Sequence, residues 1–167
     1  LTNEGQRQVA LLIDEAHNLP DRARRMFSAD INTNQLSKLK QALGNAHPNC
    51  KHALDKIIAC IRDASQREGV NRDSLLLEKL PTGLRAAIGN FLPITDNIIT
   101  RGEAASYHED LLEAYFELTT FVKLVDLGNE LTHTLLLEQT RQQLRLRWLC
   151  LNPGPLLEQV YEETGPA

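Results

Sequence analysis

The sequence is poor in cysteine and has no long apolar run. Its three cysteines, Cys50, Cys60 and Cys150, are too few and too widely spaced for a disulfide framework, and their odd number is typical of a reducing compartment. No apolar stretch approaches the roughly 20 residues that span a bilayer, so we expect no membrane segment. These residues also lack an initiating methionine and the pattern of a secretory signal peptide. We therefore expect a cytoplasmic protein, and we expect this sequence to be part of a longer chain.

The balance of charge gives no general attraction to nucleic acid. The chain has 18 Lys and Arg against 22 Asp and Glu, and its formal net charge is −4 at pH 7. Any contact with DNA would therefore depend on local basic patches. Its 167 residues suffice for one domain with a single hydrophobic core.

The middle of the chain is dominated by apolar residues at helical spacing. Such stripes occupy residues 36–43, 54–61 and 84–92, and Pro93 is expected to kink or break the last of these helices. Residues 69–81 are mostly polar around a short leucine run, which predicts a loop or a brief helical turn. We therefore expect a helical block from about residue 33 to 143.

The clearest predicted helix begins at Ser106. Ser106 and Glu109 have the spacing of a capping box, and an apolar stripe follows over residues 111–125. That stripe could be core, or it could be a surface that binds a partner helix.

The two ends of the chain have a different pattern. Residues 9–13 form a short apolar run typical of a buried parallel strand, and a helix is expected to start near Pro20. Residues 144–151 alternate like a strand, with Arg145 and Arg147 on the face opposite Trp148, and a short helix follows Pro153. The predicted fold is mainly α, with a helical insertion flanked by short α/β pieces.

Two acidic residues follow the first predicted strand. Asp14 and Glu15 stand where α/β folds bind ligands, because the carboxyl ends of parallel strands form the crevice of such sheets. In phosphoryl transfer to water, one acid there can hold Mg²⁺ and a second can position the attacking water. An arbitrary Asp-Glu pair is more often a solvated loop or a helix cap. The neighbouring His17 could relay the state of a bound nucleotide.

The residues around this pair resemble the DEAH box of superfamily 2 helicases. The stretch LLIDEAHNLPDRARRMFSADI is similar to that box in the XPD/DinG branch of DNA helicases. SYHEDLLEAYFELTTFVKL resembles a helix of the arch domain in that branch, and LRWLCLNPGPLLEQVY resembles its return path to the motor domain. The resemblance implies three parts: residues 1–31 as the DEAH strand and following helix of a RecA-like motor domain, residues 32–143 as the arch, and residues 144–167 as the return segment.

The resemblance also implies roles for individual residues. Asp14 would hold Mg²⁺ through water beside ATP, Glu15 would polarise the hydrolytic water, and His17 would couple nucleotide state to DNA binding. The parent protein would be an ATP-dependent helicase that moves 5′ to 3′ on single-stranded DNA, with repair or replication proteins as partners and, in a bacterium, a place at the nucleoid. The 167 residues contain no Gly-x-x-x-x-Gly-Lys-Ser/Thr loop, so we expect them to be inactive alone.

Metal sites other than magnesium receive less support. The family commonly carries an iron–sulfur cluster on four cysteines upstream of the DEAH strand, whereas the three cysteines here lie downstream and cannot be those ligands. His47, Cys50, His52 and Cys60 form a loose cluster, but their spacing matches no zinc module and favours ordinary helix residues. The alternative function, from a different class, is an all-helical protein-interaction module in which the DEAH tetrapeptide is a coincidence.

Overall fold

The computed structural model describes residues 14–67, 74–102, 106–140 and 143–164, so the predicted strand over residues 9–13 lies outside it. In chain order the elements are a 3-10 helix (Ala16–Asn18), α1 (Leu19–Met26), β1 (Ala29–Asn32), α2 (Thr33–Ala42), α3 (Pro48–Arg67), β2 (Ser74–Leu77), α4 (Leu84–Thr100), α5 (His108–Leu127), β3 (His133–Gln139), β4 (Leu144–Cys150) and α6 (Gly154–Thr164). The prediction of a mainly helical fold is confirmed for these ranges, with a small antiparallel sheet added.

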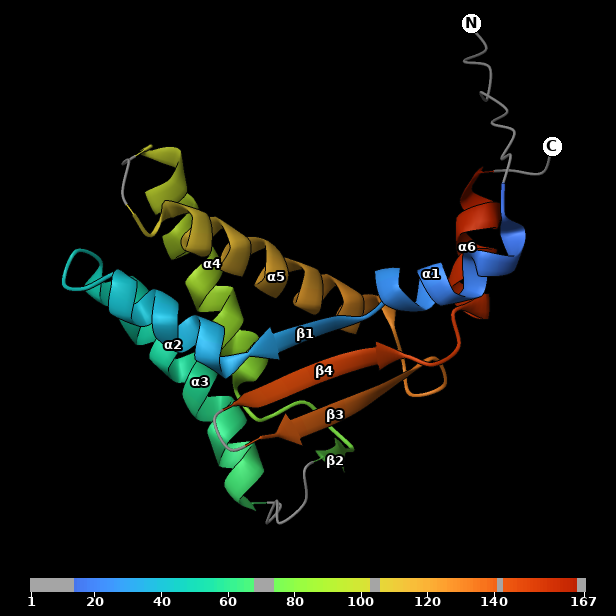
Figure 1. The fold of residues 1–167 in the computed structure, drawn as a ribbon, viewed down its shortest axis with the longest axis horizontal. Helices are drawn as coiled ribbons and strands as arrows, with labels where there is room; N and C mark the ends of the chain where they lie inside the picture. Colours follow the sequence, from blue (N-terminus) through green and yellow to red (C-terminus); the bar gives the residue numbers. More distant parts are fainter. Residues whose placement is uncertain (1–13, 68–73, 103–105, 141–142, 165–167) are drawn as a thin grey trace, which may run out of the picture.

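The sheet joins strands from distant parts of the chain. Its order is β1-β4-β3-β2, and every neighbouring pair is antiparallel. β1 and β4 lie side by side, with Ala29 opposite Trp148 and Asn32 opposite Arg145 (Figure 1). The first and last described strands of the chain are therefore direct neighbours.

Helices α2 to α5 pack on one another and on one face of the sheet (Figure 1). Strand residues alternate in burial because successive side chains point to opposite faces, and Leu135 and Leu137 of β3 face the helices. The core is mostly leucine and isoleucine and includes two phenylalanines, Phe91 of α4 and Phe121 of α5, which are 0% and 1% exposed. The apolar stripe predicted over residues 111–125 is part of this core, so it offers no free surface to a partner helix.

The prediction of helix or loop throughout residues 33–143 is wrong at two places. Residues 74–77 form β2 and residues 133–139 form β3, where helices or a loop were expected. Both segments contain three successive leucines, a pattern that does not alternate and so gives no strand signal. Their conformation comes from pairing with each other, since Leu75 lies opposite Leu137 and Leu77 opposite Leu135.

One local prediction about a helix end fails, and of the kink or break predicted at Pro93 the break is absent. The capping box does not form, because α5 begins at His108 with Tyr107 in the cap position and without a side-chain cap. The Tyr107 side chain is instead buried, and its hydroxyl hydrogen bonds Nε2 of His47 at 2.8 Å. α4 continues through Pro93 without a break, and the Pro93 carbonyl accepts a side-chain hydrogen bond from Asn97 Nδ2 at 2.9 Å.

Candidate functional site

The DEAH segment, residues 14–17, lies on the surface immediately before α1. Asp14, Glu15 and His17 are all exposed. Glu15 adopts a left-handed backbone conformation with φ of 54°, the only positive φ outside glycine among the described residues. Such a conformation is uncommon for a residue with a side chain and often marks a site where geometry matters more than local stability.

The polar groups of the DEAH segment contact each other. The backbone N–H of Glu15 donates to Oδ1 of Asp14 at 2.9 Å, and Nε2 of His17 lies 3.3 Å from Oε2 of Glu15. The side chains of His17 and Glu15 are 74% and 60% exposed, so water screens this pair and its energetic contribution is small. Both carboxylates therefore remain open to a hydrated cation or to water.

Helix α1 carries the DEAH segment and is attached to the end of β4. Pro20 lies in the first turn of α1, as predicted, although Asn18 in the cap position makes no side-chain cap. Arg24 donates from Nη1 to Asp21 at 2.8 Å and from Nε to the carbonyl of Leu151 at 3.2 Å. The acidic segment at the start of the chain is thereby fixed next to the segment that leads into α6.

The basic residues of β4 are paired with acids on the neighbouring strands. As predicted, Arg145 and Arg147 lie on one face of the sheet and Trp148 on the other. Arg145 makes a two-pronged ion pair with Asp30 of β1, and Arg147 donates to Glu138 of β3 at 3.1 Å. These carboxylates neutralise both arginines, and the sequence pattern gave no sign of them because the partners lie on other strands.

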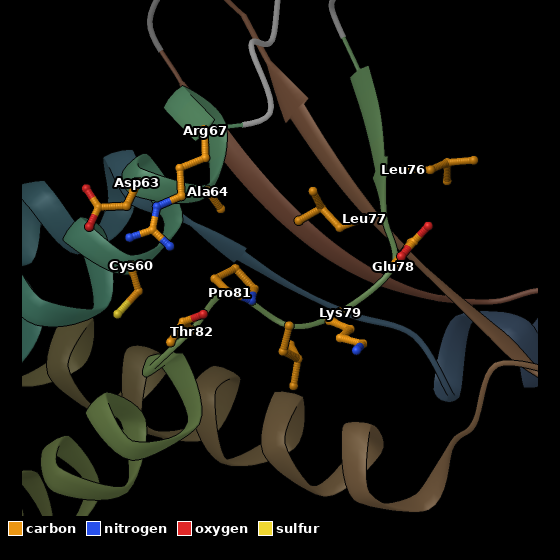
Figure 2. Close-up of a pocket in the computed structure, with 11 residues that line it drawn as sticks. Cys60, Asp63, Ala64, Arg67, Leu76, Leu77, Glu78, Lys79, Pro81 and Thr82 are labelled. Carbon is orange, nitrogen blue, oxygen red and sulfur yellow. The ribbon is translucent and has the colours of Figure 1, made fainter.

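The His/Cys cluster does not come together around a metal. Among the described residues no three His, Cys, Asp or Glu side chains are placed to hold one ion. Cys50 is buried with its Sγ 3.9 Å from Thr95 Oγ1, and burial raises the pKa of its thiol. Cys60 lines a separate hollow of about 570 Å³ between α3 and the loop after β2 (Figure 2).

This hollow brings together charged and apolar groups. Asp63 and Arg67 of α3 stand on one side, and Leu77, Glu78 and Lys79 stand on the other (Figure 2). Burial raises the pKa of the Cys60 thiol, and Asp63 raises it further, so this cysteine is not activated as a nucleophile. Among the groups that line the hollow, Cys60 is therefore present as the thiol.

Comparison with known proteins adds no relative from which a function can be transferred. The chain matches no protein-family model and no curated protein sequence. None of the described helices is both long enough and apolar enough to cross a membrane.

Proposed function

We propose that this chain is part of an ATP-dependent DNA helicase of the XPD/DinG type. In this proposal the DEAH segment and α1 belong to a RecA-like motor domain, and the helical block of α2 to α5 is the arch that gates single-stranded DNA. Residues 144–167 would lead the chain back to the motor. ATP, Mg²⁺ and an iron–sulfur cluster would be held by the intact protein.

The observation that carries the proposal is the pairing of β1 with β4. An inserted domain must leave its host and return to it at neighbouring points, and β1 and β4 run antiparallel and adjacent. The hydroxyl of Thr33, the first residue of α2, donates to the carbonyl of Leu144 at 3.0 Å. The helical block therefore begins and ends at one place, as an arch inserted in a motor domain requires.

The distribution of exposed apolar side chains also supports the proposal. At the end of the molecule that carries α1 and α6, the loop after β4 is bound to the loop before β3, since the backbone N–H of Leu151 donates to the carbonyl of Thr132 at 2.8 Å. Large exposed apolar side chains gather on α1, α6 and the loops beside them, and a surface of this kind is typical of an interface with another domain. Six of the eight large exposed apolar side chains among the described residues lie there, namely Met26, Leu127, Leu131, Leu151, Val160 and Tyr161, and the other two are Leu76 of β2 and Phe116 of α5.

The exposed carboxylates give the chemistry that the proposal needs. Asp14 would hold Mg²⁺ through water, and Glu15 would polarise the water that attacks the terminal phosphate. The described residues supply no cradle for phosphates, so the DEAH segment would work only beside a phosphate-binding loop from elsewhere in the parent chain.

The decisive experiment uses the full-length protein. Its sequence ahead of Leu1 should contain a Gly-x-x-x-x-Gly-Lys-Ser/Thr loop. Glu15→Gln should abolish DNA-stimulated ATP hydrolysis while nucleotide binding is retained, because the substitution removes the group that polarises water and leaves the metal ligand. Glu130→Gln, an exposed acid in the α5–β3 loop, is the matched control and should hydrolyse ATP normally.

Two results would reject the helicase assignment. One is a complete gene without the phosphate-binding loop, and the other is unchanged ATP turnover in Glu15→Gln. The interaction-module alternative is weakened already, because the α5 stripe that would have bound a partner is buried in this chain.

A further inference from the structure

His133 occupies a buried position where α1, the sheet and the end of α5 meet. It is the first residue of β3 and is 4% exposed. Its Nε2 lies 2.9 Å from the carbonyl oxygen of Phe27, the residue that ends α1. Because a carbonyl can only accept, the imidazole must carry a proton on Nε2 and donate it to Phe27.

The other ring nitrogen also has a defined partner. Nδ1 of His133 lies 2.8 Å from Oγ1 of Thr132. In the neutral ring Nδ1 has no proton, so the Thr132 hydroxyl donates to it. A second proton on the ring would reverse this bond and turn the hydroxyl toward the Asn129 carbonyl, which lies 3.2 Å away. The hydrogen bonds of the ring can therefore be made in either protonation state, and it is burial without a carboxylate that favours the neutral imidazole.

The ring is also held on its faces and edge. It stacks on Trp148 of β4 with centroids 5.0 Å apart and planes 7° from parallel, and the Trp148 indole N–H donates to the Leu124 carbonyl of α5 at 3.0 Å. Gly128 presses against the edge, since a Cβ there would lie 2.4 Å from Nδ1 of His133. The imidazole thus links the end of α1 to the end of α5 through the sheet.

Few other contacts hold α1 in place. Ala23 is its single buried residue, and it lies outside the main core cluster. Besides the Arg24 bond described above, Ser28 Oγ accepts from the backbone N–H of Cys150 at 2.9 Å. A short helix with so little buried apolar surface opens at low free-energy cost, so a single buried hydrogen bond is a large part of its attachment.

We propose that His133 is an acid-sensitive latch that holds α1, and with it the DEAH segment, against the sheet. In its neutral form the ring donates to Phe27 and accepts from Thr132. Protonation leaves acceptors for both ring nitrogens but places a charge in a buried site that offers no carboxylate, so the attached state loses stability and α1 detaches more often while the helical block stays folded. The inference concerns this chain alone and does not depend on the helicase assignment.

The charged groups around the latch do not stabilise an imidazolium. Arg24 of α1 is paired with Asp21, Asp126 of α5 is paired with Arg85 of α4, and Glu130 is exposed in the α5–β3 loop. β4 contributes the thiol of Cys150 opposite His133, and Arg24 lowers the pKa of that thiol against the larger effect of burial. Burial lowers the pKa of His133 below 6.5, and the bond to Phe27 offsets this only in part.

Amide hydrogen exchange of this chain by mass spectrometry tests the latch. Peptides covering α1 and α4 are compared at pH 7.5 and pH 5.0 in dilute solution, with rates corrected for intrinsic exchange. Opening of α1 should rise by up to about 30-fold at pH 5.0, the limit for a histidine that regains its ordinary pKa in the open state. Opening of α4 should not change.

Three variants separate the latch from a general structural role. His133→Phe keeps a stacked ring without a donor, so its α1 should exchange rapidly at both pH values. His133→Gln keeps a donor without titration, so its α1 should lose the response to acid. His52→Gln, an exposed α3 histidine, should behave as wild type. Equal acid responses in α1 and α4, an acid response that persists in His133→Gln, or a wild-type α1 in His133→Phe would each overturn the proposal.

Discussion

The helical block and the end formed by α1 and α6 bury their apolar side chains to very different degrees. In the block, Leu54, Phe91 and Leu111 are 0% exposed and belong to one continuous core with the sheet. At the other end, Met26 is 73% exposed and Leu131 is 89% exposed. The block and the sheet together therefore have the interior of an independent domain, whereas the other end buries few apolar side chains, Ala23 and Leu156 among them, and leaves several exposed.

The hydrophobic core and the candidate site lie in different parts of the chain. A complete core stabilises the block without help from outside, since buried apolar area is the main favourable term in folding. The end with α1 and α6 holds the candidate site but contributes little burial of its own. The candidate site and most of the buried apolar core thus lie in different regions.

The largest expected effect tests this separation by truncating one apolar side chain in each region. Phe91→Ala should lower the free energy of unfolding by about 3–5 kcal/mol, because it empties a fully enclosed site in α4. Met26→Ala in α1 should change it by less than about 0.5 kcal/mol, because the side chain is already in water. Urea unfolding followed by circular dichroism measures both, and similar losses would show that the two regions share one core.

A smaller effect is expected at the junction between the regions. Gly128→Ala should lower the free energy of unfolding by about 1–3 kcal/mol, because the new methyl group would overlap the ring of His133. Gly89→Ala is the matched control within α4, where a Cβ meets no atom within 4 Å. It should raise stability by about 0.5–1 kcal/mol through helix propensity. Thermal unfolding of the two variants should therefore shift in opposite directions.

The smallest effect concerns charge on the block. Burial raises the pKa of Glu117 of α5, and the neighbouring Glu113 and Asp30 raise it further against an opposing effect of Arg145. The folded chain therefore holds this proton more tightly than the unfolded chain, and the resulting stability is present below pH 4.5 and lost as pH rises through the folded pKa.

Glu117→Gln removes this loss. The variant should be slightly more stable than wild type at pH 7, by less than about 1 kcal/mol, and the difference should vanish below pH 4.5. Parallel thermal melts across this pH range measure it, with Glu158→Gln, at an exposed position of α6, as control. A variant that is less stable at pH 7 would show that the attraction to Arg145 outweighs burial.

The sequence predicts the helices of the block better than its strands. The stripes over residues 36–43, 54–61 and 84–92 coincide with α2 and its C-cap, α3 and α4. They could be predicted because a helix repeats its apolar residues at a short, local spacing. β2 and β3 were missed because their conformation depends on pairing between segments about 60 residues apart, which local pattern does not record. The capping box at Ser106 failed for a related reason, since the buried contact of Tyr107 with His47 prevails over a local cap.

In the candidate site and its surroundings, too, residues in a local motif could be predicted, whereas residues with distant partners could not. Asp14, Glu15 and His17 could be named from a short motif, and the structure places them together on the surface. His133 could not be singled out, because its partners Phe27 and Trp148 become neighbours only when the sheet assembles. The carboxylates that neutralise Arg145 and Arg147 were hidden in the same way.

The adjacency of β1 and β4 has a consequence for how such a chain can change. The polypeptide departs at Asn32 and comes back at Leu144 within hydrogen-bonding reach, and the segment between these residues supplies β3, the other neighbour of β4. Loops between the helices should therefore accept insertions without disturbing β1 and β4. Removal of the whole segment would instead leave β4 with an unpaired edge.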